Sequence, residues 1–268
     1  MIRLIRAEST KILTTRMWWI LGIILLGYVG LLSAGLAALL AGAGTRALGE
    51  GPSAAELGPL APLIYGFASS VGYVFPVLFG ALATTGEFRH ATLTPTFLAT
   101  PRRAYVLVAK SVVLLLVGAV YGIAGLIGSV GLGAPLLAAF GHDTQLGDGD
   151  TWLLMGRIVI AMALWAVIGV GLGTLIPSQV AAIVIVLAFT QVVEPVLRVA
   201  AAFTDWTAQV AQFLPGAASD ALVGSSFIQV TSSTGPSLEW WQGGLVLLAM
   251  AVAATIGGYF TSWRRDVT

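Results

Sequence analysis

The sequence has no cysteine, and histidine and lysine are each present only twice. The absence of cysteine excludes disulfide scaffolds, thiolate metal sites and cysteine nucleophiles. His90 and His142 are too far apart along the chain for the paired spacing of a zinc site. Neither Lys11 nor Lys110 follows a glycine-rich turn, so the chain has no phosphate-binding loop of its own. We therefore expect no metal site, no ATP site and no enzymatic activity in this chain.

Charge is also scarce. Charged residues make up 9% of the chain, against roughly a quarter in an ordinary soluble domain. Hydrophobic residues make up 57%, and the mean hydropathy is +0.94. These values exclude a soluble fold and indicate a membrane protein. The net charge of +1 gives no support for binding to nucleic acid.

Long runs without any charged residue predict the membrane spans. A bilayer core of about 30 Å needs about 20 apolar helical residues. The run at 158–193 is too long for one span, and the segment Ile176-Pro177-Ser178-Gln179 interrupts it. Pro177 disfavours helical geometry in the residue that precedes it. We therefore predict an all-α integral membrane protein with six spans in one domain over 1–268, at about 17–42, 62–85, 105–131, 152–175, 180–197 and 241–263.

Basic residues fall in three short patches between the uncharged runs. Basic residues near span ends resist translocation, so the patches mark the cytoplasmic side. Six spans place all three patches, and both termini, on that side, whereas five would put the last patch opposite the others. Ten of the thirteen Lys and Arg residues lie in these patches: Arg3, Arg6, Lys11, Arg16, Arg89, Arg102, Arg103, Lys110, Arg264 and Arg265.

The N-terminal segment predicts an amphipathic helix. Within residues 1–16, Ile2, Ile5 and Ile12 fall on one side, and Arg3 and Arg6 fall elsewhere. This pattern is typical of a basic helix that lies on the inner membrane surface. The alternative is a positively charged leader that only sets orientation.

The segment at 86–104, between the second and third spans, is longer than a hairpin connection needs. Pro95 and Pro101 divide it into short pieces, and it carries both signs of charge together with Phe88 and Phe97. We expect these aromatic residues to be exposed and the segment to dock a cytosolic partner. The alternative is a solvated loop that only supplies orienting charge.

The outer segment at 198–230 predicts a helical hairpin before the last span. Apolar residues recur there at steps of three and four, which defines one face of a helix. The piece is too short to span and is followed by the break Phe213-Leu214-Pro215-Gly216. We expect a re-entrant hairpin dipping into the outer leaflet, with a peripheral surface helix as the alternative. The apolar positions are Val199, Phe203, Trp206, Val210 and Phe213.

Polar groups within the spans are few. Ser69, Ser70, Thr190 and Gln191 are candidates to line a translocation path, although they could equally hydrogen-bond to neighbouring helices. The uncharged runs hold no ionisable residue, and Glu194 is placed near the outer end of the fifth span, spaced to pair with Arg198. A proton-coupled transporter normally needs a deeper carboxylate, so the sequence argues against a secondary transporter.

Three segments carry a resemblance to a known family. They are Arg6-Ala7-Glu8-Ser9-Thr10-Lys11, then Gly86-Glu87-Phe88-Arg89-His90-Ala91-Thr92 with Ala99-Thr100-Pro101-Arg102-Arg103, and Phe213-Leu214-Pro215-Gly216-Ala217-Ala218. In this order on a six-span scaffold, the chain resembles the membrane subunit of ATP-binding-cassette exporters of the type-two (type V) class. It looks most like the actinobacterial drug-export permeases.

The resemblance implies partners and a docking site. Two identical permease copies would form a dimer in the bacterial plasma membrane, each coupled to a nucleotide-binding ATPase subunit that carries the ATP and Mg²⁺. This chain itself would bind no cofactor. The N-terminal helix and a coupling helix in 86–104 would contact the ATPase, through Arg3, Arg6, Glu87, Phe88, Arg89, Phe97, Leu98, Arg102 and Arg103.

The expected function is export of an amphipathic drug, antibiotic, peptide or lipid-like compound, driven by the partner's ATP hydrolysis. An immunity or sensor subunit on the same scaffold is the alternative, and a secondary transporter is a weaker one. The identity of the substrate does not follow from the sequence.

Overall fold

The computed structural model describes residues 1–42, 59–100, 102–203, 205–225 and 238–263. These residues form helices and no strands. Six of the helical stretches are long and apolar enough to cross a membrane, which confirms the predicted all-helical, multi-pass architecture. They are Met17–Gly42, Leu60–Arg89, Arg103–Ala139, Gly149–Leu175, Gln179–Ala200 and Trp240–Trp263.

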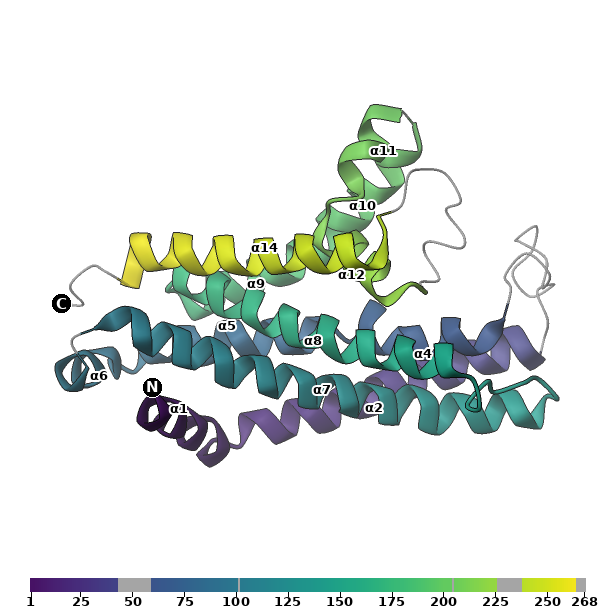
Figure 1. The fold of residues 1–268 in the computed structure, drawn as a ribbon, viewed down its shortest axis with the longest axis horizontal. Coiled ribbons are helices and arrows are strands. Elements are labelled where there is room, and N and C mark those ends of the chain that lie inside the picture. Colours follow the sequence, from purple (N-terminus) through teal and green to yellow (C-terminus); the bar gives the residue numbers. More distant parts are fainter. Residues whose placement is uncertain (43–58, 101, 204, 226–237, 264–268) are drawn as a thin grey trace.

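The helices are labelled as in Figure 1. The first half of the chain contains α1 (Ile2–Thr14), α2 (Met17–Ala37) with the π-helical turn η1 (Ala38–Gly42), α4 (Leu60–Ser70), α5 (Val74–Arg89), α6 (Leu93–Ala99) and α7 (Arg103–Ala139). The second half contains α8 (Gly149–Leu175), α9 (Gln179–Ala188), the π-helical turn η3 (Phe189–Val193), α10 (Glu194–Ala200), the 3-10 turn η4 (Ala201–Phe203), α11 (Asp205–Ala211), α12 (Pro215–Val223), α14 (Trp240–Gly258) and the π-helical turn η5 (Tyr259–Trp263).

The long helices form an elongated bundle, and the connections gather at its two ends (Figure 1). At one end lie α1, α6 and the last turn of α14, and at the other lie the connection between α7 and α8 and the start of α4. Segments from the beginning, middle and end of the sequence therefore share one end of the bundle, as an even number of spans requires. The basic patch at Arg264 and Arg265 and the predicted break at Pro101 lie outside the described residues.

The predicted boundary between the fourth and fifth spans is confirmed. Helix α8 ends at Leu175 and α9 begins at Gln179. Pro177 disfavours helix in the residue before it, and the Ser178 hydroxyl caps α9 by accepting a hydrogen bond from the Ala181 N–H at 3.5 Å. The run at 158–193 is thus two helices.

Two predicted spans differ from the structure. The third, predicted at 105–131, continues as α7 to Ala139 despite Pro135 inside the helix. The second, predicted as continuous, is interrupted at 71–73 between α4 and α5. Pro76 explains part of that break, because it lies in the first turn of α5, where its missing N–H needs no partner.

Helix packing relies on glycine where α5 crosses α8. A Cβ atom at Gly80 would collide with the Ala166 carbonyl oxygen, and one at Gly169 would collide with the Val77 carbonyl oxygen. The two backbones therefore touch directly, as small residues allow in a membrane, where no hydrophobic effect drives helices together. Close backbone approaches also occur at Gly118, Gly122 and Gly173.

Replacing Gly169 with alanine is expected to destabilise the bundle by about 1–3 kcal/mol, because the added methyl group overpacks the contact between α5 and α8. The Tm of the purified chain measures this effect. Gly156→Ala in the same helix is the control, because a Cβ at Gly156 meets no atom within 4 Å. Equal Tm values for the two variants would show that the glycine contact does not hold the helices together.

The segment that follows α9 leaves the bundle. After η3, α10, η4 and α11 turn away from the bundle axis and rise from its side, between the two ends (Figure 1). The predicted apolar face is present, but it lies on three short helical pieces and is exposed, including Val199, Phe203 and Trp206.

Helix α12 returns to the bundle, where it packs against α14, α8 and α4. Most of its side chains are buried, including Ala218, Asp220 and Leu222. Two short helices, α11 and α12, thus occupy the region of the predicted hairpin, of which residues 226–230 lie outside the described residues. The position of this hairpin in a membrane stays a prediction.

Candidate functional site

Helix α1 packs on the bundle through a face that the sequence pattern only partly predicted. Ile12 is buried and Ile5 is partly buried, as expected. Ile2 is 83% exposed, and its predicted contact with the membrane surface stays a prediction. The buried face of α1 also carries the carboxylate of Glu8, which was not predicted. A buried acid needs a cationic partner, and Glu8 has two, one on its own helix and one on the bundle.

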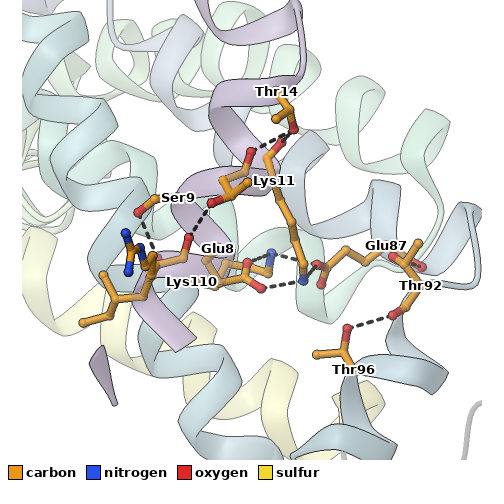
Figure 2. Close-up of polar contacts among 11 residues, drawn as sticks. Glu8, Ser9, Lys11, Thr14, Glu87, Thr92, Thr96 and Lys110 are labelled. Carbon is orange, nitrogen blue, oxygen red and sulfur yellow. Dashed lines mark hydrogen bonds and ion pairs between the residues drawn. The ribbon is translucent and has the colours of Figure 1, made fainter. Parts of the chain in front are cut away.

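Four side chains from three helices form an ion cluster (Figure 2). Glu8 of α1 accepts from Lys110 of α7 at 2.6 Å and from Lys11 at 2.6 Å. Glu87 of α5 accepts from Lys11 at 2.8 Å and lies 3.2 Å from Lys110. We call Glu8, Lys11, Glu87 and Lys110 the α1–α5–α7 ion cluster.

The cluster is neutral and mostly excluded from solvent. Lys110 is 2% exposed, whereas the Lys11 side chain is 40% exposed. Burial alone would raise the pKa of Glu8, but the adjacent charge of Lys110 and the hydrogen bonds from Lys11 and Lys110 outweigh it and lower that pKa. Burial works against the charged form of Lys11, and Glu87 and Glu8 together outweigh it, so its pKa is raised.

These pKa shifts set a pH window for the docking of α1. A lowered carboxylate pKa stabilises the fold above the unfolded-state value near 4.5, and this contribution is lost as pH falls through the folded-state pKa. A raised lysine pKa contributes below 10.5 and is lost only as pH rises past the folded-state value. The difference in Tm between the wild-type chain and Glu8→Gln should therefore be constant from about pH 5 to pH 10 and shrink below that range. A difference that stays unchanged below pH 4 would contradict the ion pairing of Glu8.

A second cluster fixes α6 at the same end of the bundle. Trp263, the last described residue, is fully buried, and its indole N–H donates to the Arg103 carbonyl at 3.1 Å. Phe88 and Phe97 meet its ring edge-on, with centroids 5.9 and 5.5 Å away. The Arg103 guanidinium lies 4.7 Å from the centre of the Phe97 ring. The end of α14 is thereby joined to α5, α6 and α7.

This cluster corrects the predicted exposure of two aromatic residues in the connecting segment. Phe88 and Phe97 were expected to be exposed, but both are partly buried against Trp263, because the end of the sixth span lies beside the connecting segment. Glu87 is also buried, in the ion cluster. Pro95 does not divide the segment, since it lies in the first turn of α6, where proline is tolerated.

The remaining predicted docking residues lie on the surface. Leu98 of α6 is 80% exposed. Arg3 and Arg6 are exposed on α1, and Arg102 is exposed just before α7. Arg89 is also exposed and donates to Gln179 Oε1 at 2.9 Å. The predicted set therefore divides into a buried group that holds α6 in place and an exposed group around Leu98 and the basic side chains.

The predicted path residues do not form one lining. Ser69 donates to the carbonyl of Gly66 at 3.0 Å within its own helix, and Gln191 is exposed. Ser70 and Thr190 share a small pocket, in which Ser70 lies 3.4 Å from Asp220 Oδ1. The Thr190 hydroxyl donates to the Val186 carbonyl at 2.8 Å. Hydrogen bonding to helices thus accounts for most of these groups.

Sequence reasoning missed the buried partners. Lys110 was treated only as an orienting charge, and Trp263 was given no role. Lys110 did carry a signal, because it stands seven residues inside a helix whose remaining length is uncharged, and a lysine there needs a partner. Asp220 carried no such signal, since it lies in the predicted outer hairpin and not in a span. Glu194 pairs with Arg198 at 2.9 Å, as their spacing predicted, and its carboxylate is also buried.

Comparisons with known proteins give no assignment. No known protein family matches the chain, and no curated protein is significantly similar to it.

Proposed function

We propose that this chain is the permease subunit of an ATP-driven exporter of the type V class, coupled to a separate ATPase. The observation that carries the proposal is the location of α1 and α6 at one end of the bundle, each fixed to the long helices by buried contacts (Figure 1). The family resemblance expects these two elements to contact the ATPase. A chain without its own ATP site needs such a mechanical connection.

The contacts are suited to transmitting a movement. Leu93 at the start of α6 is fully buried, and Trp263 contacts α6 through Phe97. The α1–α5–α7 ion cluster ties α1 to the same two long helices that flank α6 in the sequence. Because packed interiors deform little, a displacement of α6 or α1 would move α5 and α7 as one body.

The basic residues at this end support a cytoplasmic orientation. Arg3, Arg6, Arg89 and Arg102 all lie near α1 and α6, and Lys and Arg accumulate on the cytoplasmic side of membrane proteins. The exposed arginines would also complement an acidic surface on an ATPase. In this orientation α11 and α12 belong to the outer half of the protein.

The export path would form between two copies. The pocket that holds Ser70 and Thr190 has a volume of only about 40 Å³, whereas pockets for drug-sized molecules have roughly 300–1,000 Å³. Of the six spans, the first, fifth and sixth are the least buried by the rest of the chain. A second copy seated against α2 and α9 would enclose a wider path.

Efflux in cells tests the proposal. Cells that lack the gene should accumulate more of an amphipathic compound from a panel of antibiotics and dyes, and the restored gene should reverse this. The effect should persist when the proton gradient is dissipated and vanish when ATP is depleted. Resistance without any change in accumulation would indicate an immunity role, and efflux driven by the gradient alone would indicate a secondary transporter. Either outcome would contradict the proposal.

A further inference from the structure

A pocket lies where α4 and α8 begin and α12 ends, at the end of the bundle opposite α1 and α6 (Figure 1). Its volume is about 650 Å³, within the range of roughly 300–1,000 Å³ that is typical of sites for small organic ligands. Part of its wall is apolar, including Leu63, Leu154 and Val223, and part carries charge of both signs. The pocket is therefore suited to an amphipathic ligand.

Arg157 is the cation of this pocket, and it has no acidic partner. Among the described residues, its guanidinium forms no ion pair and stacks on Trp240, 4.7 Å from the centre of the ring. Arg157 lies about two turns inside a helix that is long and apolar enough to span the membrane. A charged side chain there is costly without a counter-charge and by default indicates a functional site. The guanidinium therefore points to an anionic group on a ligand.

Two carboxylates lie in the same wall. Asp150 and Arg157 are seven residues apart on α8, so they share one face of the helix and are separated by about 10 Å along its axis. Asp148 is the N-cap residue of α8, but its side chain caps no backbone N–H. Both acids are exposed and thus accessible to a cationic group. A ligand that lies along α8 would meet negative charge at one end of the pocket and positive charge at the other.

Tryptophan side chains indicate the depth of the pocket in a bilayer. Trp240, on which Arg157 stacks, begins the last span and is 51% exposed. Trp241 beside it and Trp152 on α8 are exposed as well. Exposed tryptophans gather at the level of lipid headgroups. We therefore expect Arg157 to lie at the depth of the lipid phosphate groups, in the leaflet at this end of the bundle.

Charge complementarity selects the class of headgroup. The acids Asp148 and Asp150 would repel a purely anionic headgroup, and Arg157 would repel a purely cationic ligand. A headgroup that carries a phosphate and an ammonium satisfies both signs. Among the described residues, none that lines the pocket is aromatic, whereas a trimethylammonium group is usually bound by aromatic faces. A primary ammonium instead donates hydrogen bonds to carboxylates. The lining thus favours ethanolamine over choline.

We propose that the pocket between α4, α8 and α12 binds the headgroup of a phosphatidylethanolamine-type lipid, with its phosphate diester against Arg157 and its primary ammonium against Asp148 and Asp150. Gly224 leaves room for the guanidinium, because a Cβ there would lie 3.3 Å from Arg157 Nη1. The bound lipid joins the end of α12 to α4 and α8. This inference rests on the pocket and holds whether or not the chain exports a compound.

Native mass spectrometry of the purified full chain in detergent tests the site. The chain is titrated separately with dioleoyl phosphatidylethanolamine, phosphatidylcholine and phosphatidylglycerol. One phosphatidylethanolamine should bind per chain, at least about tenfold more tightly than either other lipid, because only this headgroup forms charge-assisted hydrogen bonds at both ends. Tighter or equal binding of another headgroup would overturn the proposal. Glycerophosphoethanolamine, which has no acyl chains, should bind more weakly, and equal affinity would assign the pocket to a soluble phosphoester instead.

Two variants test the two ends of the headgroup. Arg157→Gln should weaken the binding of phosphatidylethanolamine by at least about tenfold. Asp150→Asn, at an exposed position, should keep the wild-type Tm and reduce the preference for phosphatidylethanolamine over phosphatidylglycerol. Arg16→Gln is the matched control, since Arg16 is an exposed arginine at the start of α2, at the other end of the bundle. An unchanged headgroup preference in Asp150→Asn, or an equal loss in Arg16→Gln and Arg157→Gln, would contradict the assignment.

Discussion

Leu98→Asp is expected to weaken the association with the ATPase subunit by at least about tenfold. Leu98 is the most exposed large apolar side chain of α6, at the end of the bundle where α1 also lies. Apolar anchors at the centre of an interface commonly contribute about 2 kcal/mol or more, and an aspartate there would also place a charge in the apolar part of the contact. Pull-down of the ATPase at graded concentrations of the permease measures the change.

The variant should leave the fold intact, because Leu98 contacts little of its own chain. Its Tm should therefore match that of the wild-type protein. Leu146→Asp is the matched control, since Leu146 is an exposed leucine in the connection between α7 and α8, at the opposite end of the bundle. If both variants lost association equally, or if neither lost any, α6 would not be part of the docking surface.

Lys110→Met is expected to destabilise the chain by about 3–5 kcal/mol. Without Lys110, the carboxylates of Glu8 and Glu87 share only the partly exposed Lys11. Removal of one partner from a buried ion pair is costly because it leaves an uncompensated charge. We expect α1 to detach from the bundle, which a lower Tm and faster amide exchange in residues 2–14 would show.

A double variant separates charge from packing. Lys110→Met with Glu8→Gln leaves Lys11 paired with Glu87 and restores neutrality, so it should recover much of the lost Tm. Coupling between the two positions is read from the double-mutant cycle. Additive losses would mean that the ion pair does not attach α1 to α7.

The sequence was sufficient for the six spans, because span length and the scarcity of charge are properties of local segments. The break at Ile176-Pro177-Ser178-Gln179 divided one long run correctly. The interruption at 71–73 was not predictable in this way, because its residues are as apolar as the span on either side. Hydropathy responds to composition and not to the continuity of a helix.

The candidate site was predictable only in outline. The sequence located α1 and the connecting segment, and marked both with basic residues. It could not show that Glu8 meets Lys110, since the two are 102 positions apart and the pairing depends on how the helices pack. For the same reason Phe88 and Phe97 were taken as exposed, because nothing near them in the sequence indicates Trp263.

The most direct test of the central claim is ATP turnover in a purified complex. The tagged chain should be isolated from its native membrane together with a nucleotide-binding ATPase subunit. After reconstitution into nanodiscs, ATP hydrolysis by that subunit should be several-fold faster with the wild-type permease than without it, and Leu98→Asp should abolish the stimulation. If no ATPase is isolated with the chain, or if its turnover is the same with and without the permease, the account is contradicted.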